Sequence, residues 1–193
     1  MPVRFQHSLQ SHSIYFITFT CHKWSNLFSI TNTYDAVYKW FDSLYEKKCR
    51  VMGYVIMPNH VHVLLYFPVM PKSLNIVIGN ANRFMAYEII KRLEADKNFL
   101  LLQELYDNVK KGERKKGQRH KVFEDSFDAK ECYSNEFVFQ KPDYIHRNPV
   151  SKKWSRKLSG VTDFVDYPYS SASFYEKGLG NYAKLQHVNE ILM

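Results

Sequence analysis

The chain has 193 residues, 45% of them hydrophobic and 16% aromatic, which is enough apolar material for one folded domain and excludes a disordered tail. Its formal net charge of +8 favours a polyanionic partner, with nucleic acid as the first candidate, although a basic surface can also serve solubility alone. The N-terminus has no apolar signal core, and no stretch reaches the roughly eighteen apolar residues of a membrane span, so we expect a cytoplasmic protein without a membrane partner.

The first half of the chain predicts a strand, a helix and a hairpin. Residues 14–21 are β-branched and aromatic throughout, which is typical of a buried central strand. Residues 31–33 offer helix caps, and apolar residues at helical spacing follow them up to Leu44. Strands at 50–57 and 60–67 come next, joined by a tight turn at Pro58-Asn59.

A second helix is predicted after two prolines. Ser73 is its expected N-cap, and we expect it to run for roughly twenty residues. Five apolar residues at helical spacing should face inward: Leu74, Val77, Ile78, Ala81 and Met85. The order of elements predicts an α+β fold, an antiparallel sheet with helices packed on one face.

Residues 107–122 are dense in lysine and arginine, contain Gly112 and Gly117, and offer almost nothing to bury. We predict a basic, mobile surface loop within a single domain that spans residues 1–193. Such a segment is either a solvated linker or an arm that contacts DNA phosphates. The candidate phosphate-binding residues are Lys110, Lys111, Arg114, Lys115, Lys116 and Arg119.

Two histidines open the strand predicted at 60–67. Residues two apart on a strand point to the same face, so His60 and His62 leave the sheet together while Val61 and Val63 enter the opposite layer. Two neutral imidazoles side by side form half of a divalent-metal site. His-x-His also occurs by chance, and such pairs are often structural.

A later segment supplies further polar groups. Residues 135–148 predict a helix that ends near Asn148, because the residue before a proline disfavours the α region. Tyr144 and Asn148 are four residues apart and therefore share a helix face. Lys141 and Arg147 lie three residues on either side of the tyrosine and are candidates for contacting DNA phosphates, whereas His146 should point away.

These two segments resemble a known family. Met57-Pro-Asn-His-Val-His-Val-Leu-Leu65 followed by Asp143-Tyr-Ile-His-Arg-Asn-Pro-Val150 is similar to the single-tyrosine HUH transposases, and most similar to the REP-associated tyrosine transposases. Supporting matches occur at residues 15–20 and 167–172. The resemblance implies a ferredoxin-like core and a nucleoid-associated enzyme that cleaves single-stranded or hairpin DNA. It also implies that Tyr144 forms a 5′-phosphotyrosine link and releases a 3′-hydroxyl.

The chemistry assigns a role to each residue of this set. A tyrosine phenol is a poor nucleophile at neutral pH, so the phosphodiester must be made more electrophilic. A divalent ion held by His60 and His62 would polarise it, and Asn148 can supply a third, oxygen ligand. Two nitrogens and one oxygen suit Mg²⁺ or Mn²⁺.

Several alternatives stay open. Pro142 stands where the family usually has a helix-compatible residue, and it predicts either a helix shortened to begin near 142 or a tilted Tyr144. A catalytically inactive nucleic-acid-binding module of the same descent would use the same charge. A small-molecule metalloenzyme would need a further histidine or carboxylate ligand. Monomer and homodimer are both compatible with the sequence.

Overall fold

The computed structural model describes residues 12–69, 73–158 and 160–192. The strands are β1 (Ser13–Thr20), β2 (Arg50–Met57), β3 (His60–Phe67) and β4 (Asp128–Glu131). The longer helices are α2 (Tyr34–Glu46), α3 (Leu74–Ala95), α4 (Phe99–Asp107), α6 (Asn135–His146) and α7 (Ala172–Lys177). Short helical segments are η1 (His22–Trp24), α1 (Leu27–Ile30), α5 (Lys111–Arg114), η2 (Phe164–Asp166) and α8 (Asn189–Leu192).

The strands form one antiparallel sheet in the order β2-β3-β1-β4. β1 and β2 are separated in the sheet by β3, and the chain crosses between them through α2. The chain crosses from β3 to β4 through α3, α4 and α5. This is the split βαβ arrangement of ferredoxin-like folds, and the predicted α+β class is confirmed.

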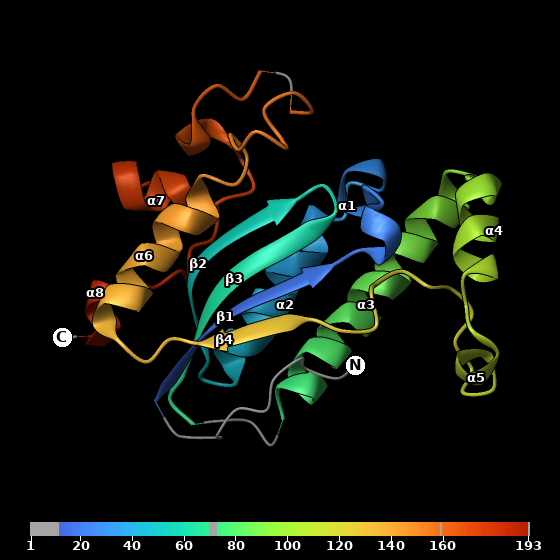
Figure 1. Cartoon of the computed structure of the whole chain (residues 1–193), viewed down its shortest axis with the longest axis horizontal. Helices are drawn as coiled ribbons and strands as arrows, with labels where there is room; N and C mark the ends of the chain where they lie inside the picture. The colour runs from blue at the N-terminus through green and yellow to red at the C-terminus, as the bar shows by residue number, and fades with distance from the viewer. Residues whose placement is uncertain (1–11, 70–72, 159, 193) are drawn as a thin grey trace.

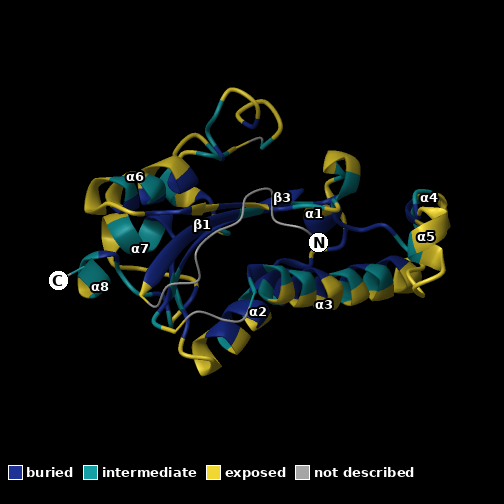
Figure 2. Ribbon diagram, turned by 60° about the horizontal axis from the view of Figure 1, so that its bottom comes forward, coloured by how far each residue is buried: buried dark blue, intermediate teal, exposed yellow. Residues whose placement is uncertain are grey.

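Helices cover both faces of the sheet. α2 and α3 lie along one face, and α6 lies along the other, with α7 beside it near the β2 edge of the sheet (Figure 1 and Figure 2). Because side chains alternate along a strand, β3 sends Val61 and Val63 into the core under α2 and α3, while Leu64 packs in a second apolar cluster with Ile145 of α6. The structure therefore adds a second helical layer to the one that the first half of the sequence predicts.

The predicted hairpin and caps agree closely with the structure. β2 and β3 have the predicted bounds, and the Ser73 hydroxyl oxygen accepts a hydrogen bond of 3.1 Å from the Asn75 N–H at the start of α3. The inward residues of α3 are buried except Val77, which is partly buried against the same core. α4 and β4 were not predicted, because neither has a periodic apolar pattern long enough to identify it.

Residues 107–122 differ from the predicted mobile loop. They contain α5, and Val109, Lys121 and Val122 are buried. The Lys121 ammonium forms ion pairs with Glu113, at 2.5 Å, and with Asp125. The density of charge in this segment is typical of a solvated loop. In the structure, Glu113 of α5 and Asp125 beyond the segment neutralise the Lys121 ammonium, and Lys121 is buried.

α6 runs without a break through Pro142, which is buried inside the helix. The helix therefore begins at Asn135 and not near residue 142, and its Ser134 N-cap oxygen accepts a hydrogen bond of 3.2 Å from the Phe137 N–H. Proline removes one helical N–H donor, and α6 remains continuous despite this loss. None of the helices in the described ranges combines the length and apolar character needed to cross a membrane.

Candidate active site

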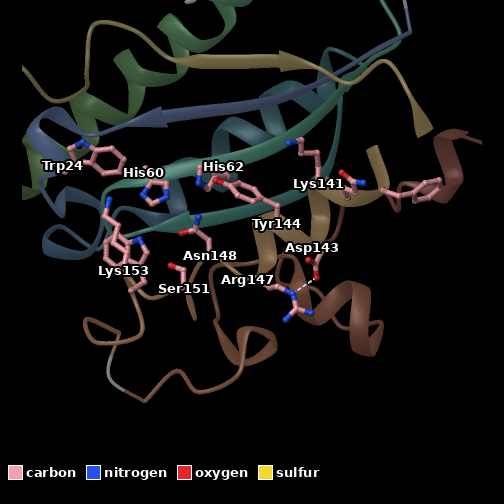
Figure 3. Close-up of a pocket in the computed structure, with 13 residues that line it drawn as sticks. Trp24, His60, His62, Lys141, Asp143, Tyr144, Arg147, Asn148, Ser151 and Lys153 are labelled. Atoms are coloured by element: carbon pink, nitrogen blue, oxygen red, sulfur yellow. Dashed lines mark hydrogen bonds and ion pairs between the residues drawn. The ribbon is translucent and has the colours of Figure 1, made fainter. Parts of the chain in front are cut away.

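A pocket of about 930 Å³ lies between the histidine end of β3 and the last turns of α6. Figure 3 shows His60 and His62 pointing into it from the sheet, and Tyr144 and Asn148 approaching from α6 and the residues just after it. The structure thus brings together the four polar residues that the sequence singled out.

The two imidazoles lie side by side, with ring centroids 4.7 Å apart. His60 Nδ1 is 2.7 Å from the Asn59 side-chain oxygen, and His62 Nδ1 is 2.7 Å from the Thr18 hydroxyl. The Asn59 amide also donates through Nδ2 to the Trp24 carbonyl at 2.8 Å, which fixes which end of the amide is oxygen. An amide oxygen only accepts, so His60 Nδ1 carries the proton and the lone pair is on Nε2.

Both imidazoles are neutral at pH 7. Burial, aided by the neighbouring His62 and Lys153, holds the pKa of His60 well below its usual range, and proximity to Asn148 opposes that shift. Burial, with the Lys141 charge, lowers the pKa of His62 to about 4. Neutral imidazoles with a free lone pair are the form that binds a metal ion.

Tyr144 projects from α6 toward His62 (Figure 3). Its ring centroid is 5.7 Å from that of His62 and 5.7 Å from that of Phe16, which it meets edge-on. The tyrosine remains 54% exposed. The side chain lines the pocket and is accessible to a molecule that enters it.

Asn148 lies just past the end of α6, and its amide points toward the histidines (Figure 3). Its side-chain oxygen is buried close to His60 and accepts no well-aligned hydrogen bond from the described residues. A buried amide oxygen normally has a partner, so this atom fits a third ligand beside the two imidazoles. Among the described residues no group of three or more His, Cys, Asp or Glu gathers, so a metal here would depend on this oxygen.

His146 points away from the pocket, as predicted. It is buried, and its Nε2 is 2.8 Å from the Ser171 hydroxyl. Burial lowers the pKa of His146 to about 4, so the ring is neutral. Its role in the structure is to pack α6 against the chain beyond η2.

The predicted phosphate-binding residues fall into two groups. Lys141 and Arg147 line the pocket. The Lys141 ammonium lies over the rings of Phe16, Phe137 and Tyr144, at 4.7, 4.1 and 5.5 Å, and Arg147 forms an ion pair of 2.7 Å with Asp143. The second group lies at the opposite end of the molecule, on α5 and the residues on either side of it (Figure 1). It comprises Lys110, Lys111, Arg114, Lys115, Lys116 and Arg119.

The structure adds residues that the sequence did not identify. Trp24 and Lys153 line the pocket beside His60, and Trp154 packs against it. Asn59 was interpreted only as a turn residue, although its place next to His60 was a signal for a supporting role. Nothing local in the sequence identifies Trp24, because only the folded chain brings it to the histidines.

Comparison with solved structures finds a REP-associated tyrosine transposase bound to a REP hairpin. The TM-score is 0.58 with 14% sequence identity, over 97% of this chain and 99% of that chain. At this identity the likeness establishes a shared fold. No protein-family model matches the sequence, and no curated protein matches it.

Proposed function

We propose that this chain cleaves and rejoins single-stranded DNA through a covalent link to Tyr144, as a DNA transposase. The observation that carries the proposal is the meeting of an exposed phenol, two neutral imidazoles and a buried, unbonded amide oxygen in one pocket. These polar groups add little to the packing of a hydrophobic core. Phosphoryl transfer, in contrast, requires a nucleophile next to groups that stabilise negative charge on a phosphate.

The proposed step is a transesterification. The Tyr144 oxygen attacks phosphorus and loses its proton, a phosphotyrosine bond forms, and the bond from phosphorus to the 3′-oxygen breaks. The 3′-oxygen takes up a proton and leaves as a hydroxyl. Because one ester replaces another, a 3′-hydroxyl can reverse the step and join strands without an external energy source.

The proposal gives separate tasks to the polar and basic residues in and around the pocket. His60, His62 and Asn148 would hold Mg²⁺ or Mn²⁺, and Asn59 and Thr18 orient the two imidazoles. When bound, such an ion polarises the phosphate and offsets charge on the leaving oxygen. Lys141 and Arg147, which line the pocket, would contact the phosphates of the strand.

The proposed substrate is DNA that contains a hairpin. The net charge of +8 suits a polyanion, and the solved relative of the same fold is bound to a REP hairpin. A hairpin presents a stem together with flanking unpaired nucleotides, and an unpaired strand can enter a pocket that a duplex cannot.

The test is adduct formation on labelled single-stranded hairpin DNA in Mn²⁺, with the DNA taken from the region flanking the gene. Wild-type protein should give a slow-migrating, protease-sensitive species, and Tyr144→Phe should give none. Tyr133→Phe is the matched control, because Tyr133 is 82% exposed just before α6 and should leave the adduct intact. An adduct of unchanged yield in Tyr144→Phe would contradict the proposal.

The second candidate is a binding module of the same fold that no longer cleaves DNA. The observation that favours it is the sparse ligand set, which has no third histidine or carboxylate among the described residues. This candidate predicts salt-sensitive binding of hairpin DNA with no adduct in Mg²⁺ or Mn²⁺.

A further inference from the structure

Four rings form a row across the floor of the pocket, from Trp24 through His60 and His62 to Tyr144 (Figure 3). Successive ring centroids are 5.8, 4.7 and 5.7 Å apart. Trp24 and Tyr144 therefore stand at opposite ends of the histidine pair. The row therefore has an exposed aromatic residue at each end and two polar imidazoles between them.

Trp24 combines solvent exposure with an uncommon backbone conformation. The residue is 53% exposed, and its backbone lies in the left-handed region, with φ of 57° after Lys23 at 52°. Residues with a side chain adopt this conformation seldom and at an energetic cost, so surrounding contacts must impose it. Such conformations cluster at active sites and ligand-binding surfaces, which makes Trp24 a candidate for contact with a ligand of the pocket that it lines.

Hydrogen bonds on both sides of Trp24 hold it there. The Lys23 N–H donates to the Glu124 carboxylate at 2.8 Å, and the Trp24 carbonyl accepts from Asn59 Nδ2 at 2.8 Å. The same Asn59 amide holds His60 through its oxygen. The Asn59 side chain thus holds both the backbone of Trp24 and the imidazole of His60. These two hydrogen bonds fix the distance between the indole and the imidazole.

We propose that Trp24 is a stacking platform for an unpaired nucleobase of the DNA strand, on the side of the scissile phosphate that leaves with the 3′-hydroxyl. The proposal rests on the proposed function. In phosphoryl transfer the attacking and leaving oxygens lie roughly in line on opposite sides of phosphorus. With Tyr144 attacking from the His62 end, the 3′-oxygen departs toward His60 and Trp24.

Lys153 gives this platform a phosphate contact. Its ammonium lies 3.7 Å from the centroid of the Trp24 ring, and the side chain is exposed. A base that stacks on the indole can displace the ammonium, which then lies beside the backbone of the same nucleotide. Aromatic rings paired with lysine are the usual means by which proteins hold single strands without reading their sequence.

The experiment measures binding without chemistry, using Tyr144→Phe protein and a single-stranded oligothymidylate in Mg²⁺. Trp24 is the exposed tryptophan, while Trp40 and Trp154 are buried, so stacking should quench the indole fluorescence of Trp24. Trp24→Leu should abolish the quench and weaken binding by roughly five- to 150-fold, the range for loss of one stacked base. Trp24→Phe should retain most of the affinity.

Phe84→Leu is the matched control, because Phe84 is 61% exposed on α3, on the opposite face of the sheet. It should bind the oligonucleotide as the parent does. Equal affinity of the parent and Trp24→Leu, or failure of the parent to bind, would overturn the platform. Weakening by Phe84→Leu as large as that by Trp24→Leu would overturn it as well.

A second arm tests the side of the scissile phosphate, after the adduct assay has mapped the cleaved bond. An abasic nucleotide on the 3′-hydroxyl side should weaken binding by the parent but not by Trp24→Leu. The same pattern with the abasic nucleotide on the phosphotyrosine side would overturn the assignment of side. Trp24-dependent binding without any adduct would overturn the proposed cleavage and the side assignment, and leave the stacking platform supported.

Discussion

The Ser171 hydroxyl lies 2.8 Å from His146 Nε2 and joins the helix that carries Tyr144 to the edge of the sheet. The same hydroxyl oxygen accepts a hydrogen bond of 2.9 Å from the Tyr54 N–H of β2. Ser171 also pairs with β2 through its own backbone, its N–H donating to the Tyr54 carbonyl at 3.0 Å. Three distant parts of the chain therefore meet at one buried hydroxyl.

Replacing this hydroxyl should destabilise the protein. Ser171→Ala leaves the Tyr54 N–H and the His146 ring nitrogen buried without a partner, and we expect a loss of about 1–3 kcal/mol in the free energy of unfolding. Urea unfolding measures this change. Ser155→Ala removes an exposed hydroxyl and should change stability by less than about 0.5 kcal/mol. Equal stabilities of the two variants would argue against the buried junction.

Asn59→Ala should weaken metal binding while leaving the histidines in place. The variant removes the acceptor that keeps the proton on His60 Nδ1, so the lone pair on Nε2 is no longer enforced. Loss of such a supporting group typically lowers metal affinity about 10- to 100-fold. Titration calorimetry with Mn²⁺ is the measurement, and Asn80→Ala, an exposed change on α3, is the control. Unchanged affinity in Asn59→Ala would remove Asn59 from the proposed site.

The Lys121 ion pairs predict a pH dependence of stability. Lys110 and Lys121 hold the pKa of Asp125 well below its usual range. Because the pKa is lower in the folded state, the carboxylate stabilises the protein above the unfolded-state pKa of about 4, and that contribution is lost as the pH falls through the folded-state value. Asp125 is 48% exposed, so solvent screening limits the effect to about 1 kcal/mol.

Asp125→Asn should accordingly be less stable than wild type at about pH 5, and the difference should shrink toward about pH 2. Urea unfolding at several pH values gives the comparison. Glu176→Gln alters an exposed carboxylate on α7 and serves as the control. A difference that stays constant over this range would show that the ion pairs with Asp125 do not set the pH dependence.

The basic residues after α5 should affect DNA binding and not the covalent step. Changing Lys115, Lys116 and Arg119 together to Gln removes charge beside α5, at the end of the molecule opposite α6, the helix that carries Tyr144 (Figure 1). If the segment contacts DNA, affinity should fall and the salt dependence should weaken, by about 0.7 in log–log slope for each lost phosphate contact to a single strand. The rate of adduct formation at saturating DNA should be unchanged.

Lys141→Gln provides the contrast for that experiment. Lys141 lines the pocket beside Tyr144, so its loss should slow adduct formation even when DNA is saturating. A triple variant that slows the covalent step as much as Lys141→Gln would show that the α5 segment reaches the pocket when DNA is bound.

Local patterns in the sequence determined much of the scaffold. The turn at Pro58-Asn59 sets the hairpin, the two-residue period places His60 and His62 on one face, and Ser73 begins α3. These features depend on neighbours within a few residues, where backbone sterics and hydrogen bonding act directly. Spacing within each pair, His60 with His62 and Tyr144 with Asn148, is local too, whereas the two pairs were connected only through the resemblance of both segments to one family.

Only the tertiary structure decided what surrounds them. It placed α6 on the second face of the sheet, brought Trp24 and Lys153 beside His60, and buried Lys121 between two carboxylates. Each of these outcomes depends on contacts between residues far apart in the chain, whose free energy comes from packing and desolvation of the whole fold. A local sequence pattern does not specify such long-range contacts. These features could therefore be identified only from the tertiary structure.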